Sequence, residues 1–379
     1  MLRRIINTSG GQSSVEALAQ HFLNTHRARQ RRNGASKLRL PVDRRTPETN
    51  LSVSTFLQNM KPKAVFNRID LAALDGAHCG EQRVVYSLDD SDPFTLIFES
   101  KIPNPRRNLG LAGCKPIARF WANLQRRGVS NQNRATRLAQ LFFSGVRSQN
   151  VRIPAVVHFN RYRGRWGQIR SNSFVGFQKW QLREFRTHLA NGRPIFAPGV
   201  VQDNPLAELY GNAVPRGFNG KVEVLNRLKR QFRNDLINNQ LNRLMAPELE
   251  GIRDRKQILT GFSVKQPKKF YEFQSDAQGQ ADDINQHVVN GLRNRIRTAI
   301  PDEINLSPQH IINRLDALTC GGCHQRTTGK FVAPGIQWPQ SLGFVHVGNN
   351  GSLSPALRNV FLPERKKIME SILCMPNPS

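Results

Sequence analysis

The chain has 379 residues, enough to bury a substantial core, and its mean hydropathy of -0.50 without a long apolar run argues against a membrane-spanning helix. It carries 56 Lys and Arg residues against 27 Asp and Glu residues, a formal net charge of +29. Residues 1–50 contribute only +7 of this excess, so the folded body is basic too. This balance predicts attraction to polyanions or to an acidic partner, with a solubilising surface bias as the alternative. Arg and aromatic residues alternate at 161–166, but no nucleic-acid-binding signature accompanies them.

The first half of the chain predicts strands and loops behind a helical start. Residues 1–50 predict a basic N-terminal arm with one short helix, whose apolar residues share one face after a serine start signal. Residues 51–220 predict an α+β domain with long loops. The β-rich runs at 83–87 and 95–99 flank a turn cluster, which favours an antiparallel hairpin. Further helices are expected from Pro116 and near 132–143, and further strands at 153–159 and 166–175.

The second half predicts helices. Residues 221–300 predict a helical connector that contains a long amphipathic helix and a second helix at 282–298. Residues 301–379 predict a mainly helical, cytochrome c-like segment, in which Ser307 starts a helix that runs to Cys320. The predicted fold class is therefore α+β, a mixed strand and helix body with long loops and this helical end.

One short motif carries a specific chemistry. The stretch LTCGGCHQ contains Cys320, Cys323 and His324 in the spacing Cys-x-x-Cys-His. Covalent haem needs two thiols that reach both vinyl groups and an imidazole presented to the iron from the same turn. Chance produces on the order of 0.0015 such matches in a chain of this composition. The motif thus predicts one covalent haem c per chain, with His324 as the proximal ligand.

Two other interpretations of the same cysteines stay open. A zinc site would use Cys320 and Cys323 with dispersed partners such as His78, Cys79 or His346. Alternatively, Cys320 and Cys323 form a structural or redox disulfide, because the Cys-x-x-Cys spacing also suits thiol exchange.

The second axial ligand of a haem is harder to assign. His346 ranks first, because it lies on a strand-like piece at 341–347 within reach of the motif. The other candidates are His287, His310, Met369 and Met375. An open sixth position would favour peroxide or small-ligand chemistry over simple electron transfer.

The remaining cysteines bear on the compartment. His78 and Cys79 are adjacent, which invites a nucleophile interpretation, but neighbours on an extended chain point to opposite faces. A disulfide between Cys79 and Cys114 is favoured over a free thiol if the compartment is oxidising. The first twenty residues lack the apolar core of a secretory signal, so the chain is processed, its start is misplaced, or it is not exported.

Several runs together resemble an uncharacterised family of bacterial secreted or lipoprotein-like proteins. They cover roughly residues 60–375 and read AVFNRIDL, HCGEQRVVY, LGLAGC, GQIRSN, WQLREF, CGGCH and SLGFVHV. The resemblance implies export, an oxidising compartment and a Cys79–Cys114 bridge, and it implies no established activity. Separately, Cys320, Cys323 and His324 are similar, residue by residue, to the haem-attachment motif of c-type cytochromes.

The sequence as a whole predicts a periplasmic or extracellular mono-haem protein that transfers single electrons to or from an acidic partner, with charge steering the encounter. The first alternative is a non-catalytic cell-surface protein that binds polyanions, with Cys320 and Cys323 in a disulfide or a zinc site. The second alternative is a haem peroxidase-like enzyme.

Overall fold

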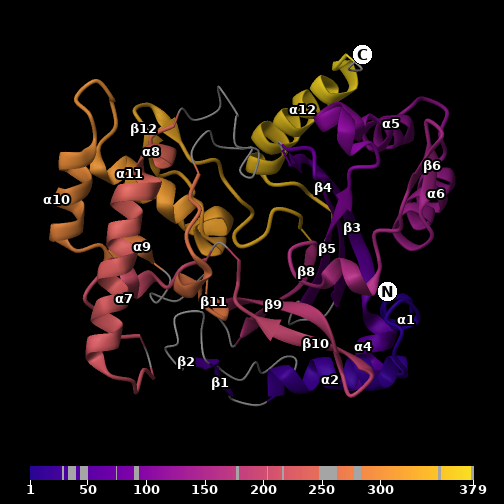
Figure 1. The fold of residues 1–379 in the computed structure, drawn as a ribbon, viewed down its shortest axis with the longest axis horizontal. Coiled ribbons are helices and arrows are strands. Elements are labelled where there is room, and N and C mark those ends of the chain that lie inside the picture. Colours follow the sequence, from indigo (N-terminus) through magenta and orange to yellow (C-terminus); the bar gives the residue numbers. More distant parts are fainter. Residues whose placement is uncertain are drawn as a thin grey trace.

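The centre of the molecule is a seven-stranded antiparallel sheet (Figure 1). The computed structural model describes residues 1–27, 30–32, 40–42, 50–73, 75–88, 94–175, 179–202, 204–215, 217–246, 263–276, 283–348 and 351–376. The strand order is β10-β9-β8-β5-β4-β3, with β11 also paired to β9. The strands are β3 (Lys61–Ala72), β4 (His78–Leu88), β5 (Phe94–Pro103), β8 (Gly167–Val175), β9 (Lys179–Ala190), β10 (Arg193–Gly199) and β11 (Gln274–Asp276).

The two faces of this sheet differ in chemistry because successive strand residues point to opposite sides. Phe98 lies opposite Val84 and Ile169, so these three side chains share what we call the apolar face. Glu99 lies opposite Arg83 on the other side, which we call the charged face. The charged face carries Glu81, Arg83, Glu99, Arg170, Glu184 and Arg186.

Helices from both ends of the chain form one core with the apolar face. The ring of Phe22 alone contacts four other phenylalanine rings, those of Phe56, Phe94, Phe185 and Phe196. The helices are α1 (Leu2–Asn7), α2 (Val15–Arg27), α4 (Val53–Asn59), α5 (Lys115–Leu124), α6 (Asn131–Phe143) and α12 (Leu362–Cys374). The first two helices therefore belong to the principal core, whereas the sequence suggested a separate N-terminal arm.

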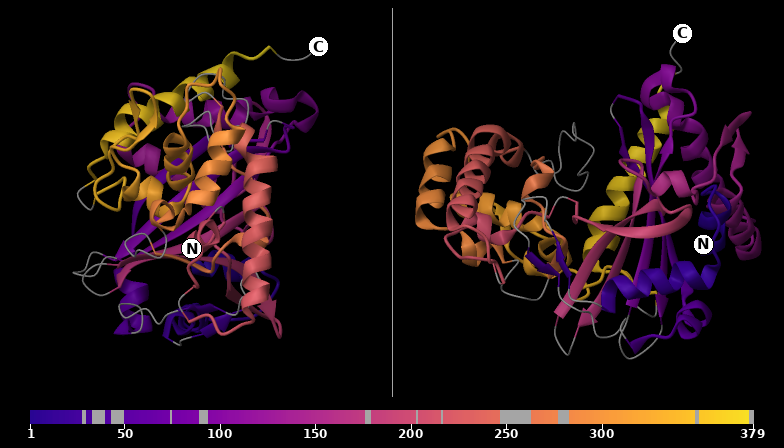
Figure 2. Two further views of the ribbon diagram at one scale, coloured as in Figure 1. Left: turned by 90° about the vertical axis from the view of Figure 1, so that its left-hand side faces the viewer. Right: turned by 60° about the horizontal axis from the view of Figure 1, so that its bottom comes forward.

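A second core lies in a helical cluster beside the sheet, at the left of Figure 1 and in the right-hand view of Figure 2. Its centre includes Leu225, Phe232, Ile296 and Ile311, all buried. The helices are α7 (Val222–Asp235), α8 (Leu241–Leu244), α9 (Ile284–His287), α10 (Asn290–Ala299) and α11 (Pro308–Ala317), and a π-helical segment, Leu236–Gln240, joins α7 to α8.

The chain after α11 packs on the charged face. Phe66 of β3, which is opposite Arg83, contacts a small cluster that contains Trp338 and Phe361. Trp180 and Leu182 of β9 contact Cys320 and Phe344 in the same way. The elements of this layer are the π-helical segments Gly322–Arg326 and Ala356–Phe361 and the hairpin β12 (Phe331–Ala333) and β13 (Ile336–Gln337). Two further short pairs are β1 (Gln30–Arg32) with β2 (Leu40–Val42) and β6 (Val146–Ser148) with β7 (Val151–Ile153).

The predicted fold class is confirmed: the structure is α+β with a helical C-terminal segment. The hairpin of β4 with β5 and the helices α5 and α6 lie where the sequence placed them. No helix within the described ranges combines the length and the apolarity that crossing a bilayer requires.

Other boundaries differ from the predictions. The strand expected at 153–159 does not form: β7 ends at Ile153, because Pro154 cannot donate to a ladder, and a 3-10 turn follows at Phe159–Tyr162. The helix expected at 282–298 is divided into α9 and α10 by extended residues at 288–289. The piece at 341–347 is a turn-rich loop with isolated bridges, not a strand.

Candidate functional site

The Cys-x-x-Cys-His motif lies directly after α11, whose start matches the sequence prediction. Ser307 and His310 form a capping box, and the helix ends at Ala317 rather than at Cys320. A second short helical turn then carries the motif, and Gly322–Arg326 within it is π-helical. Such π-bulges recur at functional sites, where they redirect side chains.

Gly322 is required for this turn. A β-carbon at Gly322 would lie 1.7 Å from the carbonyl oxygen of Asp316, so the two backbone segments approach more closely than any side chain allows. The Oγ1 of Thr319 also accepts a hydrogen bond from the Gly322 amide at 2.9 Å. The second glycine of CGGCH therefore sets the path that brings the cysteines and the histidine onto the sheet.

The two motif cysteines lie on the charged face, and neither is part of a disulfide. Cys320 contacts Trp180 and Leu182, and its amide donates to the Oδ1 of Asn204 at 3.0 Å. The Sγ of Cys323 lies 3.9 Å from the Nε2 of His346. Burial raises the pKa of the Cys323 thiol to about 11, so this thiol is protonated at neutral pH.

The imidazole of His324 is held in one orientation from two sides. Its Nδ1 lies 2.7 Å from the carbonyl oxygen of Phe344, and because a carbonyl only accepts, Nδ1 carries the proton. Trp180 stacks on the ring, with centroids 5.1 Å apart and planes at 29°. Burial lowers the pKa of His324, so the ring is neutral and its Nε2 keeps a lone pair. This is the tautomer that a metal-binding histidine needs.

His346 comes from the loop opposite the motif. Its Nδ1 lies 2.9 Å from the Oγ of Ser354, and its ring centroid is 5.0 Å from that of His324, with planes at 43°. Burial lowers the pKa of His346 to about 3, so this imidazole is neutral as well. The structure thus brings Cys323, His324 and His346 close to one another.

Beneath the motif lies a buried layer of paired charges. Glu99 is 1% exposed, and its carboxylate lies 3.5 Å from Arg83 and 3.6 Å from Arg170. Arg170 also reaches Glu184 at 3.2 Å. Burial alone would raise the pKa of Glu81, but the charge and hydrogen bond of Arg83 hold it at about 2. Buried ions of this kind persist only when each has its partners.

The proximal half of a haem site fits these residues. No disulfide joins Cys320 to Cys323, and a neutral imidazole whose Nδ1 is hydrogen-bonded follows them in the required order. The distal half does not fit His346 as it lies. Two imidazoles on opposite sides of one iron have centres roughly 6 Å apart, given metal–nitrogen bonds of about 2 Å. The observed 5.0 Å leaves no place between the rings for a porphyrin.

A small tetrahedral metal ion would require a different spacing of its ligands. Two imidazoles bound to one such ion have centres roughly 5 Å apart, and a thiolate sulfur lies roughly 3.5 Å from a neighbouring imidazole nitrogen. Both values are close to those observed for the His324–His346 and Cys323–His346 pairs. Even so, no group of three or more His, Cys, Asp or Glu side chains within the described residues is arranged to hold a metal ion.

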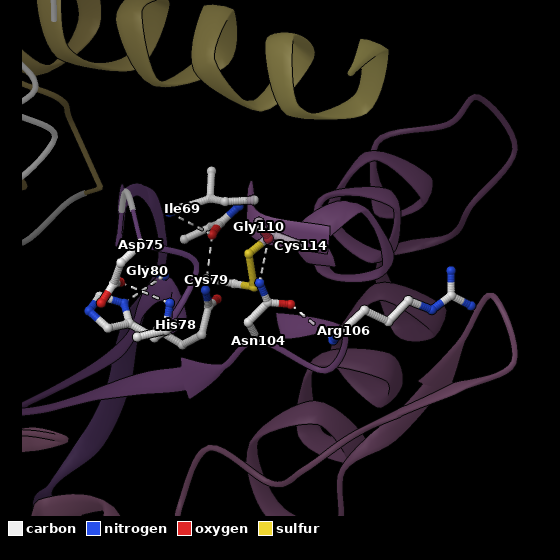
Figure 3. Close-up of a disulfide and its surroundings, with 12 residues drawn as sticks. Ile69, Asp75, His78, Cys79, Gly80, Asn104, Arg106, Gly110 and Cys114 are labelled. Carbon is white, nitrogen blue, oxygen red and sulfur yellow. Dashed lines mark hydrogen bonds between the residues drawn. A yellow bond between two sulfur atoms is a disulfide. The ribbon is translucent and has the colours of Figure 1, made fainter. Parts of the chain in front are cut away.

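The other predicted site residues lie elsewhere. Cys79 and Cys114 form a disulfide with their α-carbons 5.3 Å apart, the pairing that the sequence favoured (Figure 3). This bridge removes Cys79 from any zinc site or nucleophile. The Nδ1 of His78 accepts from the Gly80 amide at 3.3 Å, and that of His310 accepts from the Ser307 amide at 3.1 Å. His310 therefore serves as a helix cap.

Three groups that hold the site were not predicted from the sequence. They are Trp180, the carbonyl of Phe344 and the hydroxyl of Ser354. Only Ser354 carried a signal, since Ser354-Pro355 reads as a helix start, and its Oγ accepts from the Leu357 amide at 3.0 Å.

The comparisons with known proteins returned nothing. The chain matches no protein-family model, no curated protein and no solved structure.

Proposed function

We propose that this protein is an extracytoplasmic carrier of one covalent c-type haem, attached to Cys320 and Cys323 with His324 as the proximal ligand. The observation that supports the proposal most strongly is the state of His324. Its Nδ1 donates to the Phe344 carbonyl and its Nε2 is left to bind iron, beside two cysteines that are outside any disulfide and at the haem-attachment spacing. The Cys79–Cys114 disulfide supports an oxidising compartment, which covalent haem also implies.

Each neighbouring residue has a role in this proposal. Trp180 and Phe344 fix the plane of the His324 imidazole, and Gly322 sets the spacing of the two thiols. A bound haem would supply a one-electron Fe(III)/Fe(II) couple. Arg83 and Arg170 of the charged face beneath it would raise the reduction potential of this couple, because their positive charge stabilises the ferrous form relative to the ferric form. His346, whose ring centroid lies 5.0 Å from that of His324, could serve as a second iron ligand only after moving.

Net charge supports electron transfer with an acidic partner. A formal charge of +29 produces a long-range attraction for anionic surfaces, which raises association rates and weakens with added salt. The rate of reduction by a small acidic redox protein should therefore fall steeply as ionic strength rises.

The test is the absorbance spectrum of protein produced with export and haem-maturation machinery. Soret and alpha bands that survive acid-acetone extraction are expected for the wild type and for Cys374→Ser, since Cys374 is exposed and lies outside the motif. Cys320→Ser and Cys323→Ser should each lose most of the covalent haem, and the double variant all of it. Absence of covalent haem in wild type that is exported and folded would remove the proposal.

A second candidate function follows from the 5.0 Å spacing of the two imidazoles. The same cluster would then hold one zinc ion as a structural site, in a non-catalytic protein that binds polyanions. Metal analysis of the exported protein separates the two candidates. One zinc per chain, lost in His346→Ala and retained in Cys374→Ser, would favour this function over haem.

A further inference from the structure

One stretch of the chain concentrates positive charge without any compensation. Between Glu99 and Glu184 there are 17 Lys and Arg residues and no acidic residue, so all 27 acids lie outside this stretch. The next largest number of basic residues in a stretch without an acid is six, in residues 17–42. A solubilising bias would be distributed along the whole chain, whereas this segregation builds a local positive potential.

The same stretch folds into a cleft lined by arginines. The cleft has a volume of about 620 Å³ and lies between α5, α6 and the β6–β7 hairpin, which adjoin one another at the right of Figure 1. Arg119 of α5, Arg137 of α6 and Arg147 of β6 line it, each from a different element. The amide side chains of Asn123 and Gln140 line it too. All three arginines are exposed, and no carboxylate in the described part of the chain forms an ion pair with them.

Several bonds fix the walls of the cleft relative to each other. The Cys79–Cys114 disulfide links Cys114, the residue directly before α5, to β4. The Oγ of Ser148 donates to the Pro116 carbonyl at 2.7 Å, which joins the hairpin to α5. Gln149 and its neighbour close the hairpin at positive φ, as a two-residue turn requires, and Arg106 donates to the Gln149 carbonyl at 3.1 Å. The backbone of α5 and of the β6–β7 hairpin, which carry Arg119 and Arg147, is therefore fixed before any ligand binds.

We propose that this cleft binds the phosphate groups of a small phosphorylated ligand. Guanidinium forks match phosphate oxygens in pairs, and three of them beside two amide donors offer many donors and no competing carboxylate. The volume exceeds that of a single phosphate, so a ligand with two or more phosphates, or a phosphate on a sugar or lipid head group, fits the site. This site shares no residue with the cysteine–histidine cluster and does not depend on the haem proposal.

Calorimetric titration of the full chain tests the proposal with two probes: inorganic tripolyphosphate, and vesicles containing phosphatidylglycerol set against vesicles of phosphatidylcholine. The cleft variant is Arg119→Gln, Arg137→Gln and Arg147→Gln together. The matched control is Arg107→Gln, Arg126→Gln and Arg127→Gln, three exposed arginines of the same stretch that do not line the cleft. Circular dichroism checks that both variants stay folded.

We expect the cleft variant to lose at least about tenfold in affinity, the effect of one or more charge-assisted hydrogen bonds, while the control changes by less than about threefold. Loss of tripolyphosphate binding identifies a soluble phosphorylated ligand, and loss confined to phosphatidylglycerol vesicles identifies a lipid head group. The proposal is overturned if neither probe binds. It is also overturned if both variants weaken binding equally, because equal losses would indicate binding by net charge alone, as expected for a nucleic acid.

Discussion

The two faces of the central sheet share one backbone but carry different kinds of side chain. On the apolar face, large rings such as those of Phe22 and Phe98 fill the space between the sheet and the helices. On the charged face, the carboxyl group of Glu99 is equally removed from water, yet it is paired with Arg170. Buried ion pairs are weak sources of stability compared with apolar packing of the same volume. The apolar face therefore accounts for folding, and the charged face is where a function is expected.

The largest effect should come from the apolar face. Phe22→Ala removes the ring that contacts four other phenylalanine rings and should lower the free energy of unfolding by about 3–5 kcal/mol. Chemical denaturation measures the loss. The haem content of the folded fraction should not change, because Phe22 does not touch the motif. If the free energy of unfolding and the haem content of the folded fraction both fell, the two faces would not be independent of each other.

On the charged face, Glu99→Gln keeps the shape of the side chain and removes its charge. It leaves Arg83 and Arg170 with one partner fewer in a buried layer, which should cost about 3 kcal/mol. Glu370→Gln is the matched control, since its ion pair with Lys366 is exposed and should contribute less than about 1 kcal/mol. Equal effects in the two variants, by denaturation, would mean that the charged layer is not a coupled network.

Gly322→Ala tests the turn that carries the motif. The added methyl group meets the Asp316 carbonyl, so the backbone must shift at a cost of about 1–3 kcal/mol, and the covalent haem yield should fall with it. Gly291→Ala is the control, because its added methyl group meets open space in α10 and should stabilise by up to about 1 kcal/mol. Thermal unfolding and haem absorbance report the two quantities separately. Normal haem yield in a destabilised Gly322→Ala would show that the close approach is structural only.

The last effect is a change in acid sensitivity, which is confined to acid pH. The pKa of Glu81 is about 2 in the fold and 4.5 for a free side chain, because Arg83 stabilises the carboxylate despite its burial. The unfolded chain binds the extra proton between these values, so the stability from Glu81 is present above pH 4.5 and is lost as pH falls towards 2. Glu81→Gln should lack this contribution. The difference in free energy of unfolding between the wild type and Glu81→Gln should therefore shrink by up to about 1.4 kcal/mol for each unit by which pH falls. A difference independent of pH would contradict the depressed pKa.

Local signals predicted much of the fold. The Ser307-Pro308 start, the β4–β5 hairpin and the helices α5 and α6 depend on neighbouring residues, and each lies where the sequence placed it. The end of α11 was misjudged because the close approach of Gly322 to Asp316 is a contact between turns, not a propensity.

Contacts between distant segments could not be predicted. The ring of His324 stacks on Trp180, which lies on β9, far upstream in the chain. Arg170 forms its ion pair with Glu184 only after β8 and β9 pair. His346 was placed near the motif but on a strand, because alternating apolar residues suit a strand and a bridged loop equally. Haem binding stays a prediction from the motif.

The most direct test is the mass of one tryptic peptide from exported protein. Cleavage after Arg314 and Arg326 releases residues 315–326, which carry Cys320, Cys323 and His324 together. The account predicts this peptide at its own mass plus one haem, with iron present in stoichiometric amount. A peptide at its bare mass in a zinc-containing protein, or one lighter by two hydrogens from a Cys320–Cys323 disulfide, would contradict it.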